Sequence, residues 1–156
     1  MTPRTVIISL PEETTVDEAL KSHPKLPVSR IPIYKESIDQ VTGFVLKTDL
    51  LIAAADDKRQ AQPVAEMKRK VAAIHETAPL PALLDKLVKT RDHIALVIDE
   101  HGGTAGLVTM EDLIETLLGS EIVDEADSAI DMRKLARQKW EDRARRLGIT
   151  TAQPKK

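Results

Sequence analysis

The chain repeats itself, and this internal repeat constrains its fold more than any other feature of the sequence. Residues 41–51, VTGFVLKTDLL, resemble residues 104–114, TAGLVTMEDLI. Identical residues recur 63 positions apart in the two segments: Gly43 and Gly106, Val45 and Val108, Asp49 and Asp112, and Leu50 and Leu113. Repetition over this length predicts two copies of one structural unit.

Earlier parts of the two halves align as well. Residues 10–16 match residues 74–80 at an offset of 64, and residues 30–33 are aligned with residues 93–96. Three pairs of segments in the same order, at a nearly constant offset, argue against chance similarity. The repeat divides the chain into residues 1–60, the first repeat, and residues 61–125, the second repeat. Residues 126–156 follow as an acidic linker and a basic amphipathic helical tail.

Each repeat is predicted to fold as strand, helix, strand, strand and helix, which makes the fold class α+β. Apolar runs at residues 6–8 and 71–74 predict the first strands. Thr15 and Glu18 have the spacing of a capping box, and leucines at 80, 83, 84 and 87 follow the helical period. The remaining predicted elements are strands Arg30–Tyr34, Gly43–Leu46, Ile94–Ile98 and Gly106–Thr109 and helices Asp49–Ala55 and Glu111–Leu118.

The tail has a pattern of its own. The predicted helix Met132–Leu147 carries one apolar stripe, and Lys and Arg cover its other faces. Such a helix lies on anionic lipid, docks on a partner helix or packs on the core, and the sequence leaves these alternatives open.

Composition excludes several classes of protein. The chain has no cysteine, which excludes disulfides, thiolate metal sites and a cysteine nucleophile. It has 23 Lys and Arg against 25 Asp and Glu and only three aromatic residues, which argues against a nucleic-acid partner. The longest uncharged apolar stretch, Leu50–Ala55, is far shorter than the roughly 20 residues of a membrane-spanning helix. The chain is expected to be soluble, alone or as a piece of a larger membrane protein.

Four segments carry a resemblance to a known family: Met1–Arg4, Ser29–Tyr34, Gly43–Asp49 and Asp99–Leu113. Together with the repeat, they resemble a pair of cystathionine-β-synthase (CBS) domains. More narrowly, they resemble the CBS pair of the hemolysin-C-like, CorC-type magnesium and cobalt efflux proteins, relatives of the cyclin M transport mediators. The resemblance covers roughly residues 1–125. It implies two CBS repeats packed as a pseudo-two-fold pair.

The resemblance also implies a function. In this family the CBS pair lies on the cytoplasmic side of a transmembrane domain, binds adenine nucleotides (ATP or AMP) and couples their binding to divalent-cation transport. Two pairs associate as a homodimer. The chain is therefore expected to be a non-enzymatic regulatory module at the cytoplasmic face of the cell membrane, with the transport domain upstream of it.

Thr109 and Asp112 form the most specific candidate site. A predicted strand ends at Thr109 and a helix begins near Asp112, so a hydroxyl and a carboxylate lie beside free helix amides, which attract anions. Carboxylates accept ribose hydroxyls in dinucleotide-binding folds. The resemblance assigns Asp112 to the ribose and Thr109 to phosphate. The structural alternative is that Thr109 only caps the helix and Asp112 only favours its dipole.

The matching position in the first repeat differs. Asp49 keeps the carboxylate, but Leu46 stands where the threonine should be. One good nucleotide site per chain is therefore predicted, and the first-repeat site is expected to be weak or empty. Asp49 is alternatively an ordinary acidic residue near a helix N-terminus.

Arg30 is the candidate phosphate clamp, because its planar guanidinium matches phosphate oxygens. An exposed ion pair is the alternative. The resemblance places four first-repeat residues against the nucleotide of the second repeat: Thr5, Ser29, Arg30 and Ile31. Adenine is expected among aliphatic side chains such as Ile31 and Ile94.

His93 takes the place of Arg30 in the aligned segments and is a further candidate for a phosphate contact. The other histidines, at 23, 75 and 101, have no metal-ligand spacing, so no metal site is predicted. Any Mg²⁺ is expected on the phosphates of ATP.

Two other functions stay open. One is a structural dimerisation module with vestigial nucleotide sites, which Leu46 favours. The other is a small nucleotide hydrolase, although the sequence contains no recognisable set of nucleophile, base and orienting residue.

Overall fold

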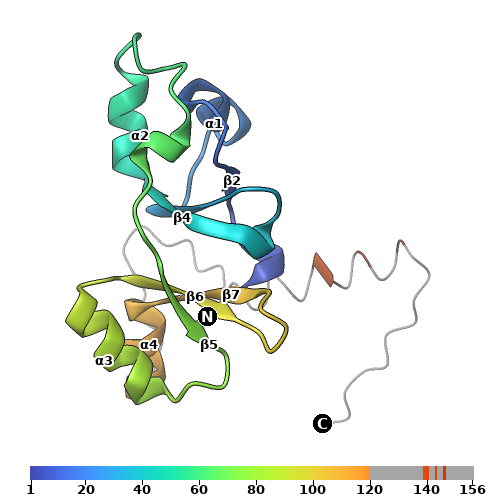
Figure 1. The fold of residues 1–156 in the computed structure, drawn as a ribbon, viewed down its shortest axis with the longest axis vertical. Helices are drawn as coiled ribbons and strands as arrows, with labels where there is room; N and C mark the ends of the chain where they lie inside the picture. Colours follow the sequence, from blue (N-terminus) through green and yellow to red (C-terminus); the bar gives the residue numbers. More distant parts are fainter. Residues whose placement is uncertain (120–138, 141–142, 144–145, 147–156) are drawn as a thin grey trace.

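The computed structural model describes residues 1–119 and four residues of the tail, 139, 140, 143 and 146. Residues 1–119 form two units, each with a small sheet and two α-helices (Figure 1). The four described tail residues are helical, and Trp140 is exposed. The predicted acidic linker and the rest of the predicted tail helix lie outside the described residues. No helix in the described part of the chain is long and apolar enough to cross a membrane.

The first unit has a three-stranded sheet in the order β2-β3-β4, and the second has a four-stranded sheet in the order β1-β7-β6-β5. The first unit comprises β2 (Leu10–Pro11), α1 (Val16–Ser22), β3 (Arg30–Tyr34), β4 (Val41–Leu46) and α2 (Lys47–Ala54). The second comprises β5 (Ala72–His75), α3 (Leu80–Thr90), β6 (Ile94–Ile98), β7 (Thr104–Thr109) and α4 (Met110–Leu118), joined by β1 (Thr2–Pro3). The predicted order of elements and the α+β class are confirmed.

Local signals explain where helices begin and end. Thr15 caps α1: its Oγ1 accepts a hydrogen bond from the backbone N–H of Glu18 (3.3 Å). In return, Glu18 Oε2 accepts one from the backbone N–H of Thr15 (3.0 Å), which completes the predicted capping box. α4 ends at Gly119, whose φ of 67° lies in the left-handed region that favours glycine.

Strand pairing shows how the two repeats correspond. Arg30 pairs with Leu46 across β3 and β4, and Ile94 pairs with Thr109 across β6 and β7. Arg30 therefore corresponds to Ile94, and the alignment of Arg30 with His93 is wrong by one residue. The error arises because the β3–β4 connection, residues 35–40, is one residue longer than the β6–β7 connection, residues 99–103.

His93 corresponds instead to Ser29. The carbonyl of Ser29 accepts a hydrogen bond from the backbone N–H of Lys47, and the carbonyl of His93 accepts one from Met110, both at 2.9 Å. Lys47 and Met110 are the first residues of α2 and α4. The same backbone bond therefore ties the start of a strand to the start of a helix in both repeats.

The two repeats exchange their leading segments. β1 pairs antiparallel with β7, with Thr2 opposite Leu107. The segment that leads into the second repeat does the reverse, since Arg69 and Phe44 of β4 exchange two backbone hydrogen bonds of 2.8 and 3.0 Å. Each repeat therefore extends the sheet of the other.

The predicted strand over residues 6–8 is wrong. The chain forms a 3-10 turn, η1 (Arg4–Val6), and enters the first sheet only at Leu10. Because β1 lies in one sheet and β2 in the other, the intervening residues have to cross between the repeats. Val6 is buried in this crossing, which accounts for its apolar character without a strand.

Each sheet has one side that packs on helices and one that looks toward the other repeat. The helix-facing residues belong to two cores: Ile31, Ile33 and Val45 with α1 and α2, and Ala95, Val97 and Val108 with α3 and α4. Side chains alternate along a strand, so Arg30, Ile94 and Thr109 lie on the opposite side. Figure 1 shows the strands between the two pairs of helices, so this side looks toward the other repeat.

Glu12 links the first repeat to the segment that enters the second. Its Oε2 accepts hydrogen bonds from the Thr42 hydroxyl (2.8 Å) and from Lys68 Nζ (3.3 Å). The Thr42 hydroxyl, and after it Lys68, hold the pKa of Glu12 below its ordinary value of 4.5. A lowered folded-state pKa means that Glu12 stabilises the fold above its unfolded pKa. That stability is lost as pH falls through the folded pKa.

We therefore expect Glu12→Gln to be less stable than the wild type at pH 7, with a difference that shrinks as both proteins are taken to pH 3. Urea denaturation of the two proteins at a series of pH values measures this. Glu13→Gln, one residue along, is the control. A difference that stays constant with pH would contradict the assignment.

Candidate functional site

The start of α4 holds a hydroxyl and a carboxylate that bond to each other's backbone. Thr109 Oγ1 accepts a hydrogen bond from the backbone N–H of Asp112 (3.1 Å), and Asp112 Oδ2 accepts one from the backbone N–H of Thr109 (2.8 Å). The Thr109 hydroxyl also donates to Asp112 Oδ2 (3.1 Å). The capping role of these two residues is thus confirmed. Capping uses only one carboxylate oxygen of Asp112, Oδ2.

The other oxygen of Asp112 faces the leading segment of the first repeat. Oδ1 accepts a hydrogen bond from the amino group of Met1, and the Asp112 side chain is 22% exposed. Asp112 and Met1 also line a cavity of about 260 Å³ with aliphatic side chains, among them Ile74, Leu80 and Leu83. Val97, Val108 and Leu113 line this cavity too, so it opens on the helix-facing side of the second sheet and not on the side that faces the other repeat.

His93 and Ile94 lie next to Thr109 in the second sheet. Ile94 is its cross-strand partner, and both side chains lie on the side that faces the other repeat. Ile94 is 5% exposed, whereas His93 is exposed. The structure therefore brings these two candidates to the start of α4.

Arg30 and Ser29 occupy the equivalent place in the first repeat, beside the start of α2. Arg30 lies on the side of the sheet that faces the second repeat. Among the described residues, its guanidinium has no hydrogen-bond or ion-pair partner, so the alternative of an exposed ion pair does not apply. Within residues 1–119, Arg30 is therefore a cation without a partner, on the side of the sheet that faces the second repeat.

Ile31 and Thr5 lie differently from the other candidates. The Ile31 side chain has no exposed surface and belongs to the core of the first repeat, so only its backbone is available to a ligand. Thr5 is exposed in η1. Since β1 and β7 run antiparallel and Arg4 shares Asp39 with the backbone N–H of Thr104, η1 lies toward the end of β7 farther from α4. It is Met1, not Thr5, that contacts Asp112.

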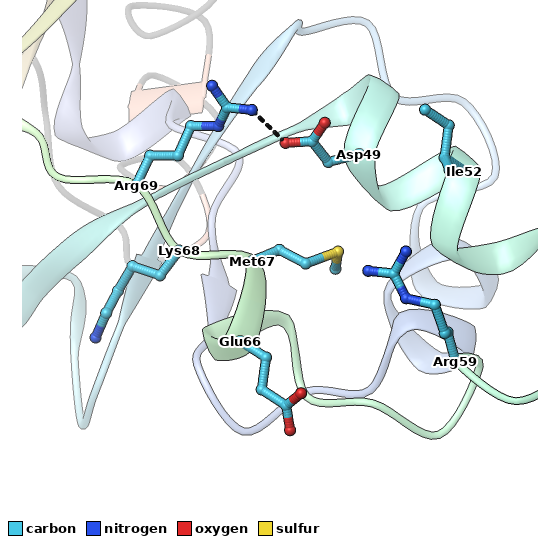
Figure 2. A pocket seen from close by; sticks show the side chains of 7 residues that line it. All are labelled: Asp49, Ile52, Arg59, Glu66, Met67, Lys68 and Arg69. Atoms are coloured by element: carbon cyan, nitrogen blue, oxygen red, sulfur yellow. Dashed lines mark hydrogen bonds and ion pairs between the residues drawn. The ribbon is translucent and has the colours of Figure 1, made fainter.

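Asp49, at the start of α2, has a partner of another kind. Leu46 is the N-cap of α2 and makes no side-chain cap bond, so no capping box forms there. Asp49 Oδ2 instead accepts a hydrogen bond from Arg69 Nη2 (2.8 Å; Figure 2). The pair lines a cavity of about 300 Å³ together with Arg59 and Met67.

Metal binding has no evident place in the described part of the chain. No group of three or more His, Asp or Glu side chains comes together there as a metal site. The site chemistry of the described residues is therefore that of a hydroxyl, a carboxylate, a guanidinium and helix amides.

Comparison with known proteins identifies the family. The CBS-domain family model matches residues 64–119. The magnesium and cobalt efflux protein CorC of Escherichia coli is 36% identical over 146 residues, which are 92% of this chain and 49% of CorC. A solved structure, the CBS domain of the bacterial CNNM/CorC family Mg²⁺ transporter, has 36% identity and a TM-score of 0.73, over 80% of this chain and 74% of that chain. The chain belongs to the CBS domains of the CNNM/CorC family.

The resemblance stated from the sequence is thus confirmed. A second solved CBS domain of the CNNM/CorC family is a complex with ATP, and it has 35% identity and a TM-score of 0.71, over 77% of this chain and 84% of that chain. This chain spans about half the length of CorC. The relatives point to a regulatory or transport-related protein rather than an enzyme.

Sequence reasoning missed two contacts of the site. Neither Met1 at Asp112 nor Arg69 at Asp49 was a candidate. Both lie in the leading segments that cross to the other repeat, and their aspartate partners are far away in the sequence. The one available signal was that a short basic segment precedes β2 and β5 alike: residues 1–4, MTPR, and residues 68–70, KRK.

Proposed function

We propose that this CBS pair is a regulatory module that binds one adenine nucleotide, ATP or AMP, between its two repeats. The start of α4 carries the proposal, because Thr109 and Asp112 place a hydroxyl and a carboxylate at the N-terminus of a helix. The ATP complex of a CBS domain 35% identical to this chain supports the same class of ligand.

Each residue of the site has a role in the proposal. In the proposal a ribose hydroxyl replaces the Met1 amino group at Asp112 Oδ1, while Thr109 and the first amides of α4 bind phosphate. Arg30 supplies a cation from the first repeat, so the nucleotide contacts both repeats. The remaining candidates contribute contacts around these groups: Thr5, Ser29, the Ile31 backbone, His93 and Ile94. Mg²⁺, where present, is bound by the phosphates of ATP.

The proposed regulation follows from binding at a junction. A nucleotide that contacts both repeats favours one arrangement of the pair and of a homodimer built from it. That preference biases an attached divalent-cation transport domain at the cytoplasmic face of the membrane. The relatives named as Mg²⁺ transporter and as magnesium and cobalt efflux protein support this partner.

The first test is a calorimetric titration of the 156-residue chain with ATP, ADP and AMP, with and without Mg²⁺. Saturable binding of about one nucleotide per chain is the expected result. No binding of any of the three at millimolar concentration would overturn the proposal and leave a structural dimerisation module as the better account. Release of phosphate from ATP above a denatured control would indicate a hydrolase instead.

Arg30→Gln is expected to weaken ATP binding roughly tenfold or more, because a hydrogen bond to a charged group is worth about 1.5–3 kcal/mol. The same change should leave adenosine binding and Tm unaltered, because Arg30 has no protein partner in the described residues. Lys35→Gln, just beyond the far end of the same strand, removes an equal charge as the control. Equal losses of ATP and adenosine binding would contradict a phosphate contact.

A further inference from the structure

We infer that an ion pair between Arg69 and Asp49, here called the latch, closes the first-repeat counterpart of the nucleotide site. Asp49 is then not a ribose ligand. The inference rests on the proposed function, since it explains why one repeat would bind a nucleotide and the other would not. Arg69 Nη2 lies 2.8 Å from Asp49 Oδ2. Figure 2 shows the guanidinium turned toward the carboxylate.

The position of the pair follows the pseudo-symmetry of the fold. Asp49 and Asp112 are the third residues of α2 and α4. Each contacts the segment that leads into the other repeat, Asp112 through Met1 and Asp49 through Arg69. Arg69 therefore reaches the carboxylate that would accept a ribose if the two repeats bound ligand alike.

Within the described residues, two groups of the second-repeat site have no counterpart beside Asp49. Leu46 has no hydroxyl where the second repeat has Thr109. The strand-pairing register places Ile94 where the first repeat has Arg30, so the second repeat offers no equivalent cation in return. Asp49 therefore lacks the threonine hydroxyl and the strand arginine that accompany Asp112. Its carboxylate forms an ion pair with Arg69 of the same chain instead.

The rival interpretation is that Arg69 binds phosphate in a working first site. Arg59 also points into the cavity, whereas Lys68 points away from it (Figure 2). Adenosine separates the two interpretations, because it has a ribose for Asp49 but no phosphate for Arg69. If Arg69 forms the latch, it opposes adenosine binding at this site. If Arg69 instead binds phosphate, it has no effect on adenosine binding.

The experiment compares adenosine and ATP titrations of the wild type, Arg69→Ala and Lys70→Ala. Lys70 is exposed and, within the described residues, has no partner. Lys70→Ala therefore removes the same charge one residue away without breaking a contact. The Asp49–Arg69 side chains are 31% and 52% exposed, and so exposed a pair contributes little to stability. Arg69→Ala should therefore fold normally, which a thermal melt checks.

We expect Arg69→Ala to gain a second adenosine-binding event, at least fivefold tighter than any second event in the wild type or in Lys70→Ala. The added change Asp49→Asn should remove the gain. An unchanged number of adenosine sites in Arg69→Ala, or loss of a second ATP event that the wild type possesses, would overturn the inference. Absence of the wild-type event at Asp112 would instead overturn the proposed function, since the latch is judged only by the difference that Arg69 makes.

Discussion

Asp112→Ala is expected to weaken adenine-nucleotide binding by at least tenfold. The change deletes the carboxylate oxygen proposed to accept the ribose, and a hydrogen bond to a charged acceptor is worth about 1.5–3 kcal/mol, or roughly ten- to a hundredfold in affinity. It also deletes the acceptor for the backbone N–H of Thr109. A helix cap contributes about 1 kcal/mol, so Tm should fall by a few degrees as well.

Two variants separate these effects. Asp112→Asn keeps an oxygen that can accept from the Thr109 backbone but loses the charge, so it should bind nucleotide weakly while retaining most of the Tm. Asp49→Ala is the matched change in the first repeat and should leave the main binding event intact. Nucleotide binding that survives in folded Asp112→Ala, with titration curves like those of the wild type, would show that α4 is capped by this residue and does not bind ligand through it.

Gly106→Val and Gly43→Val are expected to cause the largest losses of stability. A β-carbon at Gly106 would lie 2.6 Å from the backbone carbonyl oxygen of Thr2, and one at Gly43 would lie 2.4 Å from that of Arg69. In both cases the obstacle is backbone of the crossing segment, which cannot rotate away like a side chain. Overpacking of this kind costs about 1–3 kcal/mol and sometimes more, and each kcal/mol lowers Tm by about 2–4 °C in a chain of this size.

Thermal melts of Gly106→Val and Gly43→Val measure this effect. Ala73→Val is the control, since Ala73 is exposed on β5 and valine suits a strand. Both glycine variants should melt about 2–12 °C below the control. A Tm equal to that of the wild type for either variant would mean that the backbone of the crossing segment does not lie in close contact with that glycine.

Most of the fold could be predicted because its signals are local. Strands Arg30–Tyr34 and Ile94–Ile98 have the predicted bounds, and Thr15 forms the predicted cap. The pair of glycines was visible as part of the repeat, and the structure supplies its reason, which is the close passage of another segment.

The errors arose where structure depends on distant parts of the chain. The apolar run at residues 6–8 has the composition of a strand, but its neighbours on each side belong to different sheets. The misalignment of His93 came from a single extra residue in one hairpin, and a shift by one residue turns a side chain to the other face of a sheet. The Arg69 contact with Asp49 spans 20 residues and depends on the same crossing.

The exchange of leading segments also sets an order of events during synthesis. Thr2 pairs with Leu107, so the start of β1 has no partner in its sheet until more than a hundred further residues have left the ribosome. Pairings over such sequence separations form late and slow down folding. Until β7 emerges, β1 stays unpaired beside the first repeat. A nascent chain halted between the two repeats exposes both β1 and the edge of β4 that Arg69 later covers.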